Sequence, residues 1–179
     1  MAQFVPFAPN VEVHGKTVLL LIDTMGHFKR VAMQILAKYG ITDVREDAWF
    51  SQAAYLEIHK EFYTQIGPKT LKIIGKQVPE KVLWPPNIQT IENALQSIDV
   101  AYHMNHRGGE IGSYQFQSTG MRSAVMVCHN PYPCPFDMGI IEGTAIKFAP
   151  KNARLVIQHD DKQPCRMNGG DICTYQISW

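Results

Sequence analysis

The spacing of the apolar residues changes near residues 108–109, a pair of glycines, and this change restricts the fold more than any other feature of the sequence. Before the glycines, apolar residues recur every three or four positions, which is the period of amphipathic helices. After them, Tyr114 and Phe116 alternate with polar residues, and a valine-rich run covers residues 124–128, as in half-buried strands. The sequence therefore predicts a helical half followed by a half that contains a sheet.

Four helices are predicted in the first half. Glycine, proline and side-chain caps mark their ends, because glycine readily ends a helix and proline tolerates the first turn. The expected helices cover residues 17–39, 47–66, 68–76 and 87–107.

The second half is predicted to hold two strands, a helix and two more strands. The expected elements cover residues 114–118, 124–128, 136–148, 155–158 and 173–177. Gly139 and Gly143 share one face of the helix, where their missing side chains let another backbone approach closely. We predict a single α+β domain over residues 1–179, mainly helical over 1–110 and with sheet and helix over 111–179. Its order is α-α-α-α-β-β-α-β-β, and an apolar chamber is expected between the helices and an antiparallel sheet.

Composition excludes several classes of function. Lys and Arg number 17 and Asp and Glu 16, so the sequence lacks the excess of cations that nucleic-acid binding requires. The apolar run at residues 18–22 is far shorter than the roughly 20 residues of a membrane span, and no secretory signal precedes it. We therefore expect a cytoplasmic protein without a membrane span. The motifs of serine hydrolases, zinc proteases and nucleotide-binding enzymes are missing, so catalysis is not expected.

The cysteines are the most specific chemical signal. Cys165 and Cys173 flank a loop with two adjacent glycines, Cys134 precedes the predicted helix, and His159 follows a predicted strand. Thiols stay reduced in a cytosol, so the four cysteines are expected to be free, catalytic or metal-bound rather than paired in disulfides. Three sulfurs and one imidazole suit tetrahedral zinc, whereas buried cysteines also serve as small apolar side chains. The spacing alone leaves both interpretations open.

The C-terminal third resembles a known family. Cys134, Gly139 and Gly143 stand in a C-x4-G-x3-G pattern, and Cys165 and Cys173 follow it as C-x7-C. This arrangement resembles the 4-vinyl reductase-type domain over residues 128–179. That family belongs to a ligand-binding superfamily that also contains heme nitric-oxide sensors and TRAPP-complex subunits. The resemblance implies their fold of helices followed by a sheet.

The resemblance also implies a set of metal ligands. In phenol-sensing transcription activators of this family, three cysteines and a glutamate hold a structural zinc. The cysteines correspond to Cys134, Cys165 and Cys173, but Lys162 stands where the glutamate would be. We expect His159 to replace it, with Asp160 or Asp161 as alternative oxygen ligands.

Five residues are candidates for contacts with a small hydrophobic or aromatic ligand. His106 lies four positions after Tyr102, so both side chains share the apolar helix face. Trp49, Phe62 and Phe116 are further aromatic candidates. The competing interpretation is core packing, since regularly spaced aromatic residues are usually buried in the core.

Heme is the alternative cofactor. His103, His106 and Cys134, which precedes a proline, offer axial ligands. The Tyr-x-Ser-x-Arg element of the heme nitric-oxide sensors does not occur in this sequence, which weakens the heme interpretation.

Together these features predict a sensory or carrier domain that binds a small hydrophobic ligand, with a structural zinc and dimerisation to relay occupancy. The chain ends at Trp179, so we expect it to act as a carrier or to signal through a separate partner protein. The alternatives are a heme-binding gas or redox sensor and a dimeric protein-interaction module.

Overall fold

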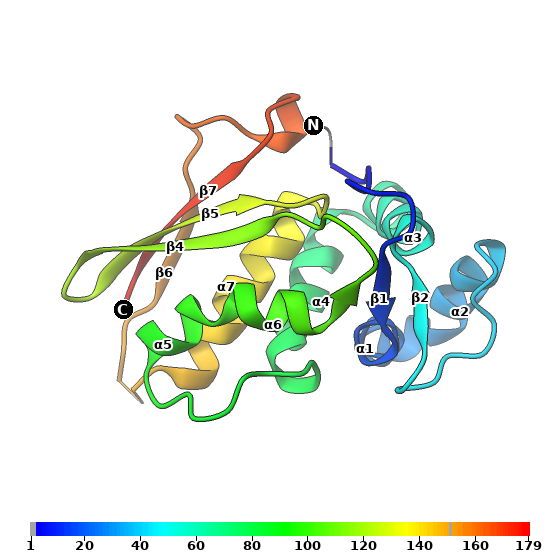
Figure 1. The fold of residues 1–179 in the computed structure, drawn as a ribbon, viewed down its shortest axis with the longest axis horizontal. Helices are drawn as coiled ribbons and strands as arrows, with labels where there is room; N and C mark the ends of the chain where they lie inside the picture. The colour runs from blue at the N-terminus through cyan, green and yellow to red at the C-terminus, as the bar shows by residue number, and fades with distance from the viewer. Residues whose placement is uncertain (1–2, 151) are drawn as a thin grey trace.

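The computed structural model describes residues 3–150 and 152–179, which form helices around two antiparallel sheets (Figure 1). The larger sheet has the strand order β4-β5-β7-β6 and the smaller sheet has the order β2-β1-β3. The strands are β1 (Glu12–His14), β2 (Trp49–Ser51), β3 (His106–Arg107), β4 (Ser113–Gly120), β5 (Ser123–His129), β6 (Val156–His159) and β7 (Cys173–Ser178).

The helices precede the larger sheet except for the last one. They are α1 (Gly15–Thr24), α2 (Lys29–Lys38), α3 (Gln52–Gln65), α4 (Pro68–Lys81), α5 (Ile91–Gln96), α6 (Ile98–Met104) and α7 (Cys134–Phe148), with short 3-10 turns at Gly26–Phe28 and Arg166–Asn168. Among the described residues, no helix is long and apolar enough to cross a membrane.

Glycines bring α4 and α7 into direct backbone contact. A Cβ added to Gly139 would lie 2.2 Å from the Lys72 carbonyl oxygen, and one on Gly143 would lie 2.2 Å from that of Lys76. From the other side, a Cβ on Gly75 would lie 2.2 Å from the Phe136 carbonyl oxygen. The predicted close approach at the α7 glycines is confirmed. It fixes the position of α7, whose first residue is Cys134, beneath the larger sheet (Figure 1).

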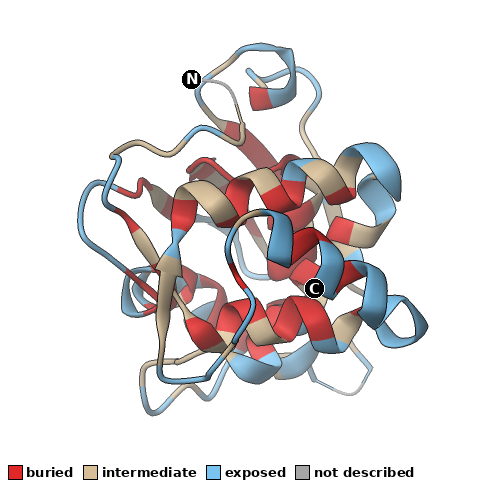
Figure 2. Cartoon of the chain, turned by 90° about the vertical axis from the view of Figure 1, so that its right-hand side faces the viewer, coloured by how far each residue is buried: buried red, intermediate tan, exposed pale blue. Residues whose placement is uncertain are grey.

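The core is built around the packed pair of α4 and α7, with α1 and α3 against α4 on one side and the larger sheet against α7 on the other. Buried residues concentrate on the facing sides of these elements, while the outer sides of the helices are exposed (Figure 2). Three tyrosines, Tyr55, Tyr132 and Tyr175, are among the largest fully buried side chains. Each of these tyrosines buries a hydroxyl group together with its ring, and each buried hydroxyl needs a hydrogen-bond partner.

The predicted α+β class is confirmed, whereas several predicted boundaries are wrong. The expected helix over 17–39 is broken at Gly26, which takes the left-handed φ of 49°. The expected helix over 87–107 begins later and is divided at Ser97. Helix α4 continues beyond residue 76 to Lys81, because burial of Val78 and Pro79 offsets the single backbone hydrogen bond that the proline removes. The three strands of the smaller sheet were not predicted.

Candidate metal centre and adjoining chamber

Three cysteines and one histidine converge at one corner of the larger sheet. Cys134 begins α7, Cys165 precedes the second 3-10 turn, Cys173 begins β7, and His159 ends β6. Antiparallel pairing of β6 with β7 places His159 opposite Tyr175, two residues beyond Cys173. The four ligand atoms all lie within 4.8 Å of one another.

The sulfur–sulfur distances can be compared with a tetrahedral zinc site. Zn–S bonds of about 2.3 Å in a tetrahedron separate the sulfurs by about 3.8 Å. Cys134 and Cys165 are 3.6 Å apart, and Cys165 and Cys173 are 3.8 Å apart, which matches this edge. Cys134 and Cys173 are closer, at 2.9 Å, yet all the cysteines are free thiols. The three sulfurs therefore form one compact cluster, and two of their three separations match the edge of a zinc tetrahedron.

His159 is oriented so that one nitrogen faces the sulfurs. Its Nδ1 lies 2.8 Å from Asp161 Oδ1, the usual arrangement when a carboxylate fixes the tautomer of a ligating histidine. Its Nε2 is buried and has no hydrogen-bond partner among the residues that the structure describes. Asp160 is engaged elsewhere, since its carboxylate accepts from Gln176 Nε2 at 3.0 Å. The geometry therefore groups His159 with the cysteines and makes Asp161 its partner.

The electrostatics of the centre favour a thiolate. The hydrogen bond from Cys134, aided by the Arg166 charge and backbone N–H, lowers the pKa of Cys173 to about 4. The same contact raises the pKa of Cys134, because the two sulfurs share one proton. Burial lowers the pKa of His159, but the negative charges of the Cys173 thiolate and the Asp161 carboxylate outweigh it and raise the value overall. Metals bind the deprotonated forms of these groups, so a divalent cation would displace the remaining protons.

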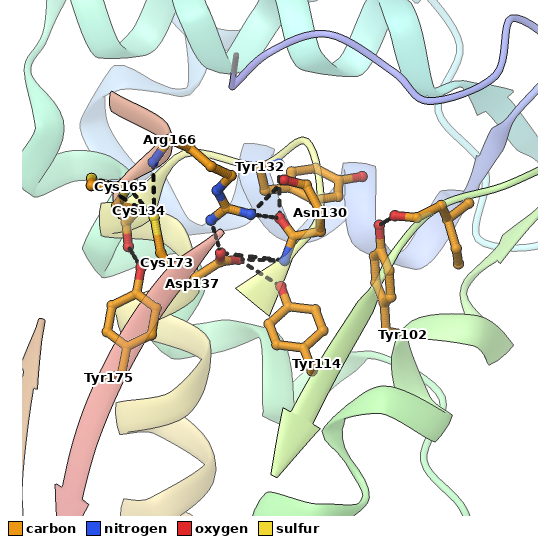
Figure 3. A network of polar contacts seen from close by, with 11 residues as sticks. Tyr102, Tyr114, Asn130, Tyr132, Cys134, Asp137, Cys165, Arg166, Cys173 and Tyr175 are labelled. Atoms are coloured by element: carbon orange, nitrogen blue, oxygen red, sulfur yellow. Dashed lines mark hydrogen bonds and ion pairs between the residues drawn. The ribbon is translucent and has the colours of Figure 1, made fainter. Parts of the chain in front are cut away.

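A buried ion pair connects the centre with the interior (Figure 3). The Arg166 guanidinium pairs with Asp137 on α7, and both side chains are almost completely buried. Arg166 also donates to Asn130 Oδ1 at 2.7 Å, and the Tyr114 hydroxyl donates to Asp137 at 2.6 Å. Burial raises the pKa of Asp137, against the opposing effect of Arg166. The backbone N–H of Arg166 donates to Cys173 Sγ at 3.5 Å, so the network begins at the cluster.

The network ends at a small apolar chamber between the helices and the sheet. The cavity has a volume of about 40 Å³. Its lining residues are Thr17, Val78, Val82, Trp84, Ile98, Ala101, Tyr102, Asn105, His106, Tyr114, Tyr132, Phe136 and Ile140. The Tyr102 hydroxyl donates to the Ile111 carbonyl oxygen at 2.6 Å. The Thr17 hydroxyl is buried, and within the described part of the chain it has no hydrogen-bond partner.

His106 lies in the wall of this chamber and uses both ring nitrogens. Nδ1 is 2.9 Å from the Tyr102 carbonyl oxygen, and Nε2 is 2.7 Å from the Tyr132 hydroxyl. Burial lowers the pKa of His106 to about 4, so the ring is neutral at pH 7. Its hydrogen bonds hold the ring in place as part of the wall.

The structure separates the five predicted ligand contacts into two groups. Tyr102 and His106 line the cavity, whereas Trp49, Phe62 and Phe116 are not among its lining residues. Trp49 lies in the smaller sheet, with the Arg107 guanidinium 4.3 Å from its ring. Phe62 is fully buried on α3, and Phe116 packs on the core from β4.

Sequence reasoning missed the residues that join the two regions. Asp137 and Arg166 are 29 positions apart and were not selected. A signal existed, because Asp137 lies one helical turn after Cys134 in an otherwise apolar segment. An acidic residue there requires a buried cation as its partner.

Comparison with known proteins identifies the fold. No protein-family model and no curated protein matches the chain. Among solved structures, an H-NOX protein from S. oneidensis in the Fe(II)NO ligation state is similar, with a TM-score of 0.69 and 14% identity over 92% of this chain and 98% of that chain. An Fe(II) unliganded H-NOX protein from K. algicida has a TM-score of 0.62 and 12% identity over 92% of this chain and 95% of that chain. The predicted fold, shared with heme nitric-oxide sensors, is confirmed.

The residues around the chamber do not fit heme in this structure. Pockets for ligands of drug size span about 300–1,000 Å³, whereas this cavity measures about 40 Å³. Both nitrogens of His106 are engaged in hydrogen bonds. The cluster fits zinc, because its donor atoms, two of its three sulfur–sulfur distances and its unpaired histidine nitrogen match a closed four-ligand site.

Proposed function

We propose that the chain is a cytosolic sensory or carrier domain of the 4-vinyl reductase type, in which Cys134, His159, Cys165 and Cys173 hold a structural zinc. The observation that carries the proposal is the convergence of four ligand atoms within 4.8 Å. The protein supplies all four ligands, which is typical of structural zinc sites, whereas catalytic sites keep an open position.

Zinc would join four segments that are distant in the sequence. They are the start of α7, the end of β6, the loop that precedes β7 and the start of β7. Because the site forms only in the folded chain, the binding free energy of the metal would add to the stability of the fold. It would also fix the loop at Cys165 and hold the adjacent Arg166 against Asp137.

The chamber would hold the sensed or carried molecule. About 40 Å³ is room for a molecule of a few heavy atoms, since an engineered cavity that binds benzene measures about 150 Å³. Tyr102 and His106 would contact it, and Thr17 would offer it a hydrogen bond. A larger aromatic ligand would require movement of the wall, most readily at Trp84, which lies in the irregular connector between α4 and α5. Occupancy would be relayed through a homodimer or a separate partner protein.

Elemental analysis of protein purified without added metal tests the zinc site. We expect about one zinc per chain and no iron. Substitution of Cys128, a buried cysteine outside the cluster, by serine is the matched control and should leave the zinc content unchanged. A wild-type protein that folds normally and contains no zinc would contradict the proposal.

A heme-binding gas sensor is the second candidate. The likeness to H-NOX structures and the position of His106 in the chamber wall favour it. Titration with hemin and absorption spectroscopy compares the two candidates on the same sample. We expect no stoichiometric Soret band. A band that appears at one heme per chain and is lost in His106→Leu would favour the heme sensor instead.

A further inference from the structure

A surface cleft of about 500 Å³ opens directly beside the metal centre. Three of the four proposed zinc ligands, Cys134, His159 and Cys165, are part of its lining. Cys173 is not among the lining residues. The remaining wall comes from the first turns of α4 and α7 and from the loop between β6 and β7. The cleft therefore gives a small solute access to two of the three sulfurs.

The three sulfurs differ in exposure. Cys173 is fully buried, Cys134 retains 6% of its exposed area, and Cys165 is partly exposed. Cys165 lies 3.6 Å from Cys134 across the cluster. A reagent in the cleft would thus meet Cys165 first, and Cys134 is the neighbouring sulfur that shares the same opening.

We propose that Cys165 is an oxidation site and that a hydroperoxide converts Cys165 and Cys134 into a disulfide with release of the metal. This inference rests on the proposed zinc site. Zinc thiolates retain nucleophilic sulfur, and oxidation is selective for accessible thiolates. The cleft makes Cys165 the accessible one.

The chemistry balances in two steps. Cys165 sulfur attacks one peroxide oxygen, the O–O bond breaks, and the departing oxygen leaves as water after protonation, which gives a sulfenic acid. Cys134 sulfur then attacks the Cys165 sulfur, an S–S bond forms, and the sulfenic oxygen leaves as a second water. Overall, two thiolates, one hydrogen peroxide and two protons give one disulfide and two waters. Sulfur loses two electrons, peroxide gains them, and Zn²⁺ leaves without a change in oxidation state.

Release of the metal follows from the loss of ligands. After the disulfide forms, His159 and Cys173 remain as ligands, which is too few for a structural site. The loop that carries Cys165 and Arg166 loses its metal anchor, and this loop supplies the cation of the buried ion pair with Asp137. Oxidation at the surface would therefore reach the interior network.

The test uses the full chain, loaded with zinc, in the Cys128→Ser background. Hydrogen peroxide is added and released zinc is followed with a chromogenic chelator. Trypsin then places Cys134, Cys165 and Cys173 on three different peptides, because Lys147, Lys162 and Arg166 separate them. We expect one zinc released per disulfide, and a Cys134–Cys165 link in the non-reducing peptide map. Reduction in the presence of zinc should restore the metal.

The outcomes separate this inference from the proposed function. A protein without zinc before oxidation contradicts the zinc site itself. A protein that contains zinc and keeps it under peroxide, or that forms a Cys134–Cys173 link instead, overturns only the oxidation site.

A substitution of Cys165 tests whether its sulfur is the one that reacts first with peroxide. Cys165→His leaves a Cys2His2 set, which is also a structural zinc site. We expect this variant to hold zinc and to release it at least tenfold more slowly under peroxide. As a readout that needs no variant, limited alkylation of the zinc-loaded protein with N-ethylmaleimide should label Cys165 before Cys134 and Cys173. Equal labelling of the three would contradict the proposed order of access.

Discussion

The candidate metal centre and the chamber lie at two ends of one buried network, and they differ in the hydrogen bonds that their histidines make. His159 Nε2 is buried and has no hydrogen-bond partner in residues 3–150 and 152–179, whereas both ring nitrogens of His106 are hydrogen-bonded. An unpaired buried polar group costs free energy unless a ligand compensates it. At the corner of the sheet, therefore, a histidine nitrogen is free to bind a cation, whereas in the chamber the histidine is fully engaged and the unpaired polar atom is the Thr17 hydroxyl.

The two regions also differ in the kind of space beside them. The metal centre adjoins an open cleft of about 500 Å³, and the chamber is a cavity of about 40 Å³. A fixed metal and a variable ligand place different demands on a protein, because the first needs rigid geometry and the second needs access and room. Experiments that disturb one region at a time can show how far the two depend on each other.

The largest effect is expected from Cys173→Ser. Loss of a structural zinc removes binding free energy that stabilises the fold, so we expect a loss of at least about 4 kcal/mol. For a chain of this size that lowers Tm by about 8–16 °C. Calorimetry with parallel zinc analysis measures it. Cys128→Ser is the control and should keep its zinc, and unchanged zinc and Tm in Cys173→Ser would show that the cluster is only packing.

A similar loss is expected when the ion pair that joins the regions is broken. Arg166→Met leaves the Asp137 carboxylate buried without its cation, which costs about 3–5 kcal/mol. The double variant Arg166→Met/Asp137→Asn removes both charges and keeps an acceptor for the Tyr114 hydroxyl. Urea unfolding should find it more stable than the sum of the single variants predicts. Strict additivity would mean that the two residues are not coupled.

Acid should act through the buried histidines. Burial lowers the pKa of His59 and of His106 from 6.5 to about 4. Between pH 4 and pH 6.5 the unfolded chain binds more protons than the folded chain. The free energy of unfolding that the neutral histidines contribute is therefore fully present above pH 6.5 and falls as the pH drops toward 4. Each histidine accounts for about 3 kcal/mol of this fall.

His59→Leu isolates one of these contributions. Between pH 6.5 and pH 4, the free energy of unfolding measured in urea should fall by about 3 kcal/mol less in the variant than in the wild type. The comparison cancels acid effects at the metal centre, which both proteins share. Parallel stability curves for the two proteins would contradict the assignment of a neutral, buried His59.

These two regions were not equally predictable from the sequence. The convergence of the three cysteines and His159 was predictable because cysteine and histidine carry chemistry that few other residues share, and the order of the cysteines matched a known pattern. The chamber was harder, because Trp49, Phe62 and Phe116 have the same aromatic character as Tyr102. Which of these aromatic residues line the cavity depends on which side of each helix or strand faces it, and the sequence does not show that.

The connecting network and the smaller sheet could not be predicted from the sequence, for other reasons. Charged residues such as Asp137 and Arg166 are usually solvated, and only the fold brings them together across 29 positions. Strands of two or three residues, such as β1 and β3, are too short to show an alternating pattern. In contrast, Gly139 and Gly143 were informative, since few functions other than close packing require two glycines one turn apart.

The smallest expected effect is the stabilisation of the protein by a ligand in an enlarged chamber, and it tests directly whether the chamber is limited by its volume. Trp84 forms part of its wall, and Trp84→Ala should enlarge the space toward that needed for a benzene-sized ligand. Phenol at ten times its Kd would then stabilise the variant by about 1.4 kcal/mol and raise its Tm by about 3–6 °C, while wild type responds less.

The unpaired Thr17 hydroxyl provides the control for this experiment. Adding Thr17→Val to Trp84→Ala keeps the shape but removes the hydrogen bond, so the preference for phenol over benzene should fall by about 1 kcal/mol. If phenol and benzene stabilise both variants equally, Thr17 does not select the ligand. The chamber would then discriminate by volume alone, and the metal centre would remain the region of the molecule where polar atoms determine what binds.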